Sequence, residues 1–447
     1  MQSTMMDYPL TVRHIFEHGR ALYGDSEVVT CEADGARRIE FAALADRAEQ
    51  LAAGLRRLGI GPGDRVATFG WNNQEHQEAY FAIPGMGAVM HTLNIRLAAD
   101  QLRYIIGHAE DSVIIADASL APVLGPVLAE AEDEVKTVRH LIVYGDSDRS
   151  ALPEHLDYEE LLAAEKPGYP WPEIDEHQAA AMCYTSGTTG LPKGVVYSHR
   201  SAFLHTLGVS SGEALAINQN DRVLQGWGLT ETSPVASLSF PPKHAPAARA
   251  LDYRATAGRP LGGVEARVVD DEGKVLPRDG QATGEIEVRG PWVTAGYYKD
   301  PAPDKFRDGW LRTGDVGRID PRGYITISDR AKDVVKSGGE WISTLELESA
   351  ILTHPAVREA AVIAAPDARW GERPLACITC VPGQSVTAEE LRAHLAGRVV
   401  KWWLPDQWVF LDEVPRTTVG KHDKKLLRER NADGSLPVVT TDGPSAK

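Results

Sequence analysis

The sequence predicts an α/β protein that combines a large layered α/β domain, residues 1–331, with a small α+β domain, residues 332–430. Three observations predict this class. Helices alternate with short apolar strands through the first half of the chain, as in layered α/β domains. From about Gly284 the pattern changes to strands and turns, and a compact α+β pattern begins after Lys332. The length of 447 residues and the hydrophobic content of 43% suit a globular protein with more than one domain.

The N-terminal pattern begins with a helix followed by a strand. Apolar residues repeat at helical spacing from Phe41 to Leu58, and the Gly61–Asp64 segment (GPGD) then ends the helix. Arg65–Phe69 is predicted as a strand and Gln74–Ile83 as a second helix. Further strands are predicted at Ser112–Ala116, Leu141–Val143 and Ala179–Tyr184.

The C-terminal half contains the elements of the middle region and of the small domain. Strands are predicted at Gly284–Arg289 and Gly323–Ser328. After Lys332, the pattern predicts helices and strands in turn. These are helices at Leu345–Leu352, Ala388–Leu395 and Lys424–Arg430, and strands at Ala360–Ala364 and Leu375–Val381. Residues 431–447 are polar with Gly and Pro, so a disordered tail is expected there.

The net charge and the shortness of the apolar runs argue against nucleic acid as a partner and against a membrane-spanning segment. The formal net charge is −16, whereas proteins that bind nucleic acid usually present a basic surface, so nucleic acid is not an expected partner. Apolar runs such as Ser112–Ala116 are too short to cross a bilayer, and Met1–Leu10 lacks the pattern of a secretory signal. We therefore expect a cytoplasmic protein that holds phosphate groups by local contacts rather than by its overall field.

The four cysteines include one pair with the C-x-x-C spacing of zinc and redox sites. This pair, Cys377 and Cys380, has no second Cys/His pair that would complete a zinc site. It falls in the predicted strand Leu375–Val381, where residues three apart point to opposite faces. Four reduced thiols are therefore expected.

The strongest local motif is a loop that follows the predicted strand Ala179–Tyr184 and reads YTSGTTGLPKG from Tyr184 to Gly194. Glycines let the backbone approach an anion closely, and a lysine supplies positive charge. The order is not that of a Walker A loop, in which Gly precedes the Lys and Ser or Thr follows it. The motif predicts a loop that wraps a polyphosphate, and a solvated linker is the alternative. Its candidate residues are Thr185, Ser186, Gly187, Thr188, Thr189, Gly190 and Lys193.

Five further motifs follow the loop along the chain. They are Gly226–Thr232 (GWGLTET), Trp310–Asp315 (WLRTGD), Asp329–Asp333 (DRAKD), Lys336–Ile342 (KSGGEWI) and Pro415–Lys421 (PRTTVGK). With these six motifs in this order, the sequence resembles the adenylate-forming enzymes, which include acyl-CoA synthetases, luciferases and peptide-synthetase adenylation domains. Through Tyr80–Leu97 and Lys336–Ser343 it resembles the bacterial medium- and long-chain fatty acyl-CoA synthetases most.

The resemblance implies a site for magnesium and a nucleotide. Glu231 would bind Mg²⁺ beside Thr185, because a hard cation that bridges phosphates prefers oxygen ligands. Trp227 would stack on adenine, with Thr230 in the same motif, and Asp315 would accept hydrogen bonds from the ribose. The alternatives are an exposed acid for Glu231, a core residue for Trp227 and a turn residue for Asp315.

The resemblance also implies a catalytic lysine and a moving C-terminal domain. Lys421 would contact the acyl carboxylate and the α-phosphate, where a cation stabilises the negative charges that meet in the transition state. Arg330 would hold the ribose, and Lys332 would be the hinge about which the domain rotates between half-reactions. A solvated lysine and a structural salt bridge are the alternatives for Lys421 and Arg330.

A third implied feature is the path of coenzyme A. Gly338 and Gly339 would line the pantetheine arm, because a thin thiol chain needs a wall without side chains. Trp341 lies in the same motif and is included among the predicted site residues. A plain turn is the alternative for the two glycines.

The function implied by the resemblance is a two-step ligation that uses ATP, Mg²⁺ and coenzyme A. A small carboxylic acid and ATP would give an acyl-adenylate and pyrophosphate, and the CoA thiol would then displace AMP. Two other functions stay open: an inactive relative that binds a nucleotide or a partner subunit, and an adenylating enzyme with a non-CoA acceptor. Whether the chain forms a homodimer also stays open.

The sequence departs from the family between the phosphate loop and the magnesium motif. Only 38 positions separate Lys193 from Glu231, and the family has roughly a hundred residues more, comparable to a small domain. The junction is predicted near Leu224–Gln225. The missing stretch would carry acyl-site and adenine contacts and strands of the main sheet, so unpaired strand edges are expected.

Three explanations of the missing stretch stay open: a damaged or misassembled coding sequence, a natural deletion that has lost activity, and a compact variant with a rebuilt site. Lys193, Glu231, Asp315, Arg330 and Lys421 all remain in the chain. A misplacement of about 1 Å can cost roughly a hundredfold in rate, so impaired activity is expected.

Overall fold

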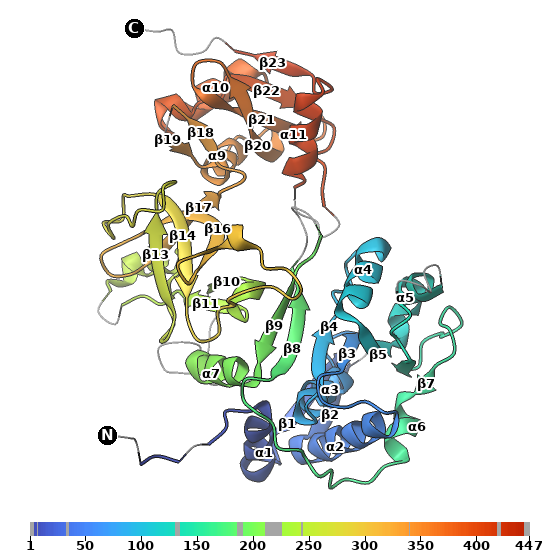
Figure 1. Ribbon diagram of the computed structural model, residues 1–447. Coiled ribbons are helices and arrows are strands. Elements are labelled where there is room, and N and C mark those ends of the chain that lie inside the picture. Colours follow the sequence, from blue (N-terminus) through green and yellow to red (C-terminus); the bar gives the residue numbers. More distant parts are fainter. Residues whose placement is uncertain are drawn as a thin grey trace.

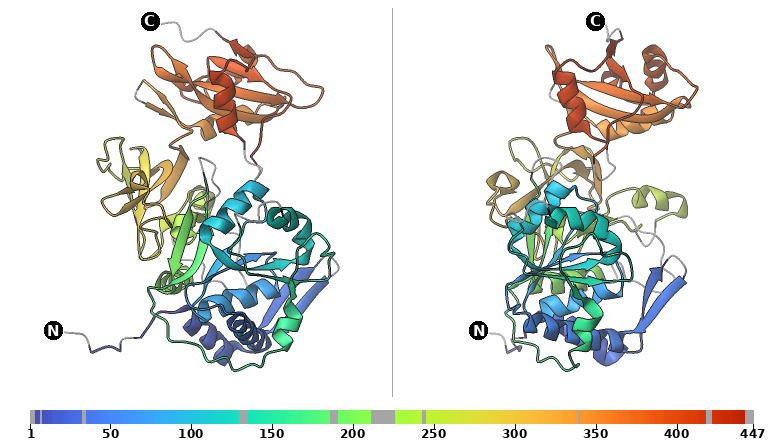
Figure 2. Two further views of the ribbon diagram at one scale, coloured as in Figure 1. Left: turned by 45° about the vertical axis from the view of Figure 1, so that its right-hand side comes forward. Right: turned by 90° about the vertical axis from the view of Figure 1, so that its right-hand side faces the viewer.

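The computed structural model describes residues 4–6, 8–32, 35–129, 135–185, 191–210, 226–242, 245–338, 340–417 and 422–441. These residues form three parts that follow one another along the chain (Figure 1). The N-terminal part is built on a seven-stranded sheet, the middle part on two smaller sheets and the C-terminal part on a six-stranded sheet. Figure 2 shows the middle part lying between the other two.

The N-terminal sheet is parallel except at one edge, where β9 runs antiparallel to β8. Along β5, Val113 and Ile115 belong to one buried cluster, whereas Ile114 and Ala116 belong to another. A strand covered on both faces is apolar at every position, which explains this continuous apolar run. The sheet order is β7 (Leu156–Asp157), β6 (His140–Tyr144), β5 (Asp111–Asp117), β3 (Arg65–Phe69), β4 (Val89–Thr92), β8 (Ala179–Tyr184) and β9 (Gly194–Ser198).

Helices cover both faces of this sheet (Figures 1 and 2). One buried cluster includes residues of α1 (Val12–Tyr23), α2 (Phe41–Arg57), α3 (Gln74–Gly85) and α6 (Tyr158–Ala163). The other includes residues of α4 (Ala99–Ala109) and α5 (Ala121–Ala129). Outside these layers lie an antiparallel hairpin and a helix that follows β9, namely β1 (Glu27–Glu32), β2 (Gly35–Glu40) and α7 (His199–Ser210).

The middle part contains two antiparallel sheets that share one buried cluster. The first has the order β10 (Gly226–Gly228), β11 (Val235–Leu238) and β12 (Arg259–Pro260). The second has the order β13 (Glu265–Val269), β14 (Gly284–Arg289), β16 (Trp310–Ile319) and β15 (Phe306–Arg307), and β17 (Ile325–Arg330) also pairs with β16. A short helix, α8 (Ala250–Arg254), precedes β12.

The C-terminal part is an α+β unit, as the sequence predicts. Its sheet order is β19 (Glu340–Ile342), β18 (Val335–Ser337), β21 (Gly371–Cys380), β22 (Gln407–Phe410) and β23 (Val438–Thr440), and β20 (Val357–Asp367) also pairs with β21. Residues of α9 (Thr344–Leu352) and α10 (Ala388–Leu395) pack in one buried cluster with Trp408. Leu427 of α11 (Lys424–Ala432) packs in another.

Several predicted bounds differ from those of the structure, for example at β20 and β21. The strand predicted at Gly323–Ser328 begins instead at Ile325, because Gly323 belongs to a turn in which its N–H donates to the carbonyl of Asp320 and its φ is +86°. The disordered tail predicted from residue 431 is wrong for residues 431–441. There α11 continues to Ala432, and Val438–Thr440 pairs with β22 through backbone hydrogen bonds, which do not depend on apolar side chains. Residues 442–447 lie outside the described residues.

The missing stretch falls between two strands that each end a sheet. Within the described residues, β9 pairs only with β8, and β10 pairs only with β11. These are the last strand before the predicted junction and the first strand after it. The expectation of unpaired strand edges on both sides of the junction therefore agrees with the sheet orders. The junction residues Leu224 and Gln225 themselves lie outside the described part.

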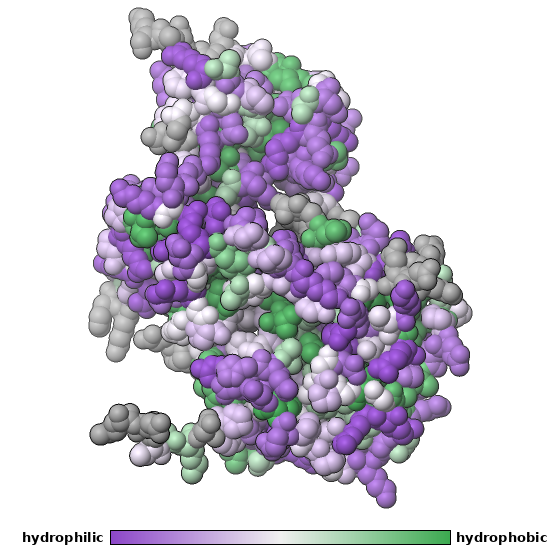
Figure 3. Space-filling model, viewed as in Figure 1, coloured by the Kyte–Doolittle hydropathy of each residue, from purple (hydrophilic) through white to green (hydrophobic). Residues whose placement is uncertain are grey.

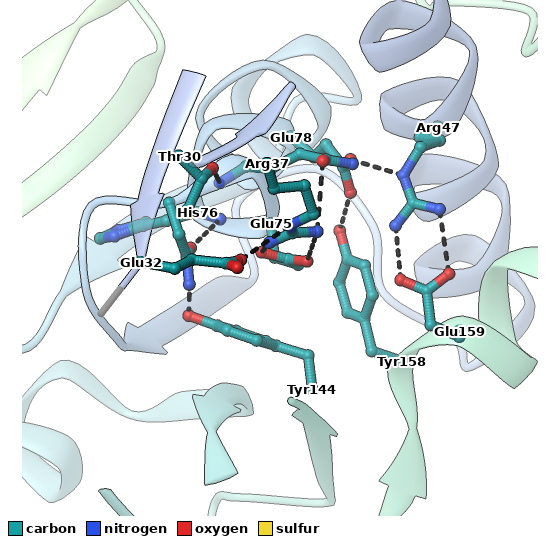
Figure 4. Close-up of polar contacts among 12 residues, drawn as sticks. Thr30, Glu32, Arg37, Arg47, Glu75, His76, Glu78, Tyr144, Tyr158 and Glu159 are labelled. Carbon is teal, nitrogen blue, oxygen red and sulfur yellow. Dashed lines mark hydrogen bonds and ion pairs between the residues drawn. The ribbon is translucent and has the colours of Figure 1, made fainter. Parts of the chain in front are cut away.

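A buried network of charged side chains fastens α2, α3 and α6 together (Figure 4). Glu78 on α3 is fully buried, and its carboxylate accepts hydrogen bonds from Arg47 at 2.6 Å, Tyr158 at 2.6 Å and Gln74 at 2.8 Å. Arg47 on α2 also holds Glu159 on α6 through two hydrogen bonds. Burial raises the pKa of Glu78, while the contacts with Arg47 oppose that shift.

The stability of the fold is expected to depend on pH through His199. It begins α7, is fully buried, and accepts a hydrogen bond at Nδ1 from the N–H of Val12 at 3.3 Å. Burial lowers the pKa of His199 from 6.5 to about 4. The unfolded chain therefore takes up this proton near pH 6.5, and the folded chain only near pH 4. The stability contributed by neutral His199 is present above pH 6.5 and is lost as the pH falls toward 4.

We therefore expect His199→Gln to flatten the pH dependence of stability between pH 6.5 and 4. The contribution of His199 over this range is at most about 3–4 kcal/mol, because the pKa falls from 6.5 to about 4 and each pKa unit corresponds to roughly 1.4 kcal/mol. Urea unfolding of both proteins at several pH values would measure it. Parallel curves for the two proteins across this range would contradict the assignment.

Candidate nucleotide-binding site

The predicted phosphate loop connects the two strands of an antiparallel hairpin, β8 and β9. Its ends are closed by two hydrogen bonds: the N–H of Thr185 donates to the carbonyl of Lys193 at 2.9 Å, and the N–H of Lys193 donates to Oγ1 of Thr185 at 3.1 Å. The hairpin therefore holds both ends of the loop at the same end of the two strands. The central loop residues, Ser186, Gly187, Thr188, Thr189 and Gly190, lie outside the described residues.

The ammonium group of Lys193 is held by two groups from one distant segment. It lies 2.8 Å from a carboxylate oxygen of Asp300 and 5.1 Å from the ring centroid of Tyr297. About a third of the Lys193 side chain is exposed, so the ion pair with Asp300 is open to solvent on one side. An exposed pair of this kind contributes little stability, about 0–1 kcal/mol, and a phosphate can replace the carboxylate as partner.

Glu231 lies on the short 3₁₀ turn Thr230–Thr232 and is half-buried. Its Oε1 accepts a hydrogen bond from the hydroxyl of Tyr297 at 2.7 Å. Burial and the Glu231 carboxylate both raise the pKa of Tyr297, so the phenol stays protonated as the donor. The carbonyl of Thr230 accepts a hydrogen bond from the hydroxyl of Tyr197 on β9 at 2.6 Å. These contacts bring the magnesium motif against the hairpin of the phosphate loop.

Glu231 fits a magnesium ion as the protein ligand of a nucleotide site. Among the described residues, no group of three or more His, Cys, Asp or Glu side chains could form a metal cage. Magnesium at nucleotide sites is usually held by one or two carboxylates, with phosphates and water as its other ligands. A single half-buried glutamate, held through one oxygen, provides the type of ligand that such a site needs.

The predicted adenine and ribose residues contact one another directly. The indole N–H of Trp227 on β10 donates to Oδ2 of Asp315 on β16 at 2.8 Å. Arg330 on β17 lies opposite Asp315 in the sheet register, and its Nε is 2.7 Å from Oδ1. Burial raises the pKa of Asp315, while Arg330 and Trp227 oppose that shift. The salt bridge left as the alternative for Arg330 is therefore present, with the predicted ribose residue as its partner.

The predicted CoA residues lie in the C-terminal part, away from β8 and β9 (Figure 1). Gly338 has a φ of +61°, and a Cβ at this position would lie 2.9 Å from the ring of Trp370. Both facts favour glycine there. Trp341 on β19 lies under the ammonium group of Lys336, which is 4.7 Å from its ring centroid. Gly339 lies outside the described residues.

The predicted hinge residue Lys332 and the segments next to Lys421 line one cleft of about 510 Å³. Lys332 is exposed and lines this cleft with Thr417 and His422, which flank the undescribed segment that contains Lys421. Other lining charges pair with one another, as in Arg428 with Asp333 at 2.9 Å. Figure 3 shows hydrophilic residues over most of the middle and C-terminal parts on the face in view. The cleft thus has a polar lining around the predicted hinge.

Sequence reasoning does not include Tyr197, Tyr297 and Asp300 among the site residues. Tyr197 lies on β9, and the other two lie in the connection between β14 and β15. Their contacts join residues 33 to 107 positions apart in the sequence, so no spacing pattern could have indicated them.

A β-hairpin whose strands are joined by a glycine-rich loop, followed along the chain by a small α+β part, is typical of adenylate-forming enzymes. The chain belongs to the AMP-binding enzyme family. The profile described as AMP-binding enzyme matches residues 16–224 and 206–298, and the profile described as AMP-binding enzyme C-terminal domain matches residues 346–421.

The chain is similar to curated relatives over nearly its whole length. In an alignment of 536 positions it is 38% identical to the long-chain-fatty-acid–CoA ligase of Thermus thermophilus, and the alignment covers 96% of this chain and 97% of the relative. It is 34% identical over 540 residues to the medium-chain-fatty-acid–CoA ligase of Ectopseudomonas oleovorans, covering 97% of this chain and 98% of the relative.

Solved structures share the fold. ATP-bound MatB from Rhodopseudomonas palustris matches with a TM-score of 0.77 at 25% identity, covering 95% of this chain and 99% of the other. The fatty acyl CoA synthetase of Mycobacterium tuberculosis matches with a TM-score of 0.66, also at 25% identity and with the same coverage. Among the described residues, no helix is long and apolar enough to span a membrane.

The comparisons also bear on the missing stretch. The alignment with the Thermus thermophilus ligase extends over 536 positions, more than the 447 residues of the whole chain, so that relative has residues with no counterpart here. The first match to the AMP-binding profile ends at residue 224, where the sequence predicts the junction. A stretch present in relatives is therefore absent from this chain.

Proposed function

We propose that the chain is an AMP-forming acyl-CoA ligase that activates a fatty acid or a related carboxylic acid, with activity lowered by the missing stretch. One observation carries the proposal. Lys193 and Glu231 come from opposite sides of the missing stretch, yet both contact Tyr297. The near full-length similarity to fatty-acid–CoA ligases supports the reaction type and the substrate class.

In the proposed first step, the carboxylic acid and ATP give an acyl-adenylate and pyrophosphate. Lys193 and residues 185–190 of the loop would hold the phosphates through N–H groups, hydroxyls and one ammonium. Glu231, with Thr185, would hold Mg²⁺, which bridges the phosphates and neutralises charge during the transfer. Lys421 would stabilise the negative charge that develops between the carboxylate and the α-phosphate.

The adenosine part of ATP would bind to residues that contact one another in the structure. Trp227, with Thr230, would face adenine, and Asp315 would accept hydrogen bonds from the ribose hydroxyls. Asp315 accepts a hydrogen bond from Trp227 and pairs with Arg330. These two residues thus hold the carboxylate in place before the nucleotide arrives.

In the proposed second step, the CoA thiol attacks the acyl-adenylate and AMP leaves. Lys332 would be the hinge that brings the second set of residues to the site. Gly338, Gly339 and Trp341 would line the pantetheine path, and the close packing of Gly338 against Trp370 fits a backbone wall that has no room for a side chain. A homodimer and a cytoplasmic location remain predictions from the sequence.

A second candidate function is a nucleotide-binding relative that no longer turns over. The missing stretch favours it, because the family carries acyl-site residues there. An assay with ATP, CoA and a panel of fatty acids separates the two candidates when ATP binding is measured in parallel. The proposed ligase produces AMP and thioester in equal amounts. ATP binding without either product would instead support the second candidate.

A further inference from the structure

We propose that Tyr297 is a positioning residue that aligns Glu231 for Mg²⁺ and couples it to Lys193. In this way the segment Thr294–Asp300 fixes the position of Glu231 relative to Lys193 in the proposed ATP site. The inference rests on the proposed function, because it concerns the same ATP site. It adds a residue outside the motifs that carry the family resemblance.

The backbone of the segment Thr294–Asp300 is fastened to both parts of the site. The N–H of Thr294 donates to the carbonyl of Glu231 at 2.8 Å, and the N–H of Tyr298 donates to the carbonyl of Gly194 at 2.8 Å. Gly194 directly follows Lys193, so the segment spans from the magnesium motif to the end of the phosphate loop. Figure 1 shows the chain before β15 reaching from the middle part to the β8–β9 hairpin.

The side chain of Tyr297 makes the corresponding contacts with the two charged groups. Its hydroxyl donates to Oε1 of Glu231 at 2.7 Å, and its ring faces the ammonium group of Lys193 at 5.1 Å. A carboxylate held through one oxygen keeps a defined orientation and leaves its second oxygen for a cation. Such a partner, one step removed from the metal, orients the ligand and commonly changes metal affinity by about 10–100-fold when it is lost.

Asp300 completes the arrangement from the other end of the segment. Its carboxylate pairs with Lys193 at 2.8 Å, while its Oδ1 accepts the N–H of Ala302 at 2.9 Å. The ion pair keeps the ammonium group over the ring of Tyr297 until a phosphate takes its place. Glu231 and Lys193 are therefore both positioned by contacts with Tyr297, without contacts from the missing stretch.

The test separates metal-linked binding from general binding of ATP. We expect Tyr297→Phe, which keeps the ring and removes only the hydroxyl, to raise the Mg²⁺ concentration needed for half-maximal ATP binding by about 10-fold or more. ATP binding in EDTA should stay unchanged, because the contact with Lys193 remains. Isothermal titration calorimetry at a series of Mg²⁺ concentrations measures both quantities. Tyr23→Phe is the matched control, since Tyr23 is an exposed tyrosine at the end of α1, outside the proposed ATP site, and it should behave as the unaltered chain.

The outcomes are distinguishable. An unchanged Mg²⁺ dependence in Tyr297→Phe, or equal weakening with and without Mg²⁺, would overturn the positioning role while leaving the proposed function in place. If the unaltered chain bound ATP with no dependence on Mg²⁺, or bound no ATP at all, the proposed function would fail together with this inference. A matching thermal midpoint for the two tyrosine variants would show that the fold is intact.

Discussion

Replacing Lys421 with alanine is expected to lower the rate of acyl-adenylate formation by about 10²–10³-fold, the usual effect of removing one group that stabilises developing negative charge. The attack of a carboxylate on a phosphate brings two anions together, so the loss of this cation raises the barrier of the first step. The second step needs no such cation, because the adenylate is already formed. Supplied acyl-adenylate should therefore still give thioester at close to the normal rate.

The two steps can be measured separately on the same protein. Pyrophosphate release in the presence of ATP and a fatty acid reports the first step, and thioester formation from synthetic acyl-adenylate and CoA reports the second. Lys401→Ala is a suitable control, because Lys401 is an exposed lysine elsewhere in the C-terminal part. Equal losses of both steps in Lys421→Ala would contradict the assigned role.

Replacing Glu78 with alanine is expected to destabilise the N-terminal part by about 3–5 kcal/mol, the usual cost of removing one partner from a buried ion pair. The change leaves the guanidinium of Arg47 without its buried partner and the hydroxyl of Tyr158 without its acceptor (Figure 4). Glu78 itself is fully buried, so water cannot replace the lost contacts without entering the interface of three helices.

An exposed ion pair on the neighbouring hairpin provides the matched control. Glu27 pairs with Arg38 at 2.7 Å, but more than half of each side chain is exposed. Glu27→Ala should therefore cost no more than about 1 kcal/mol. Denaturant unfolding measures both variants. Similar small losses for Glu27→Ala and Glu78→Ala would show that the network in Figure 4 is not a main source of stability.

Much of the fold could be predicted from local sequence patterns. The bounds of β3, β8, β14 and α10 agree with the predicted elements, because apolar periodicity and turn residues act within each segment. The failure at residues 431–441 has a different origin. There β23 is a short, exposed edge strand, and its pairing with β22 depends on backbone groups brought together by the rest of the fold. A composition-based argument cannot detect such a strand.

The candidate site, too, could be predicted only in part: the motifs indicate some of its residues, and the structure shows what contacts them. Motifs in the sequence indicate Lys193, Glu231 and Asp315, whose roles remain proposals. The structure adds what holds them: Tyr297 between the first two, and Trp227 on the third. Trp227 is itself a predicted site residue, but its contact with Asp315 joins residues 88 positions apart, and Tyr297 lies 66 positions from Glu231, so only the folded arrangement shows these contacts.

The structure also shows which contacts remain across the junction although the stretch is missing. Its absence leaves β9 and β10 as sheet edges among the described residues, yet Tyr197 on β9 still reaches the carbonyl of Thr230. The predicted phosphate and magnesium residues therefore keep contacts across the junction, whereas the acyl-site and adenine contacts that the resemblance assigns to the missing stretch would be lost with it. We accordingly expect a larger effect on use of the carboxylic acid than on ATP binding.

The central claim is that this shortened chain still forms an acyl-adenylate. The exchange of labelled pyrophosphate into ATP by the unaltered protein tests it most directly, because the exchange requires only the first step. We expect an exchange, slower than that of a full-length relative, that depends on both Mg²⁺ and a fatty acid and that disappears in Lys421→Ala. No exchange above background with any fatty acid, from a folded protein that binds Mg²⁺-ATP, would contradict it.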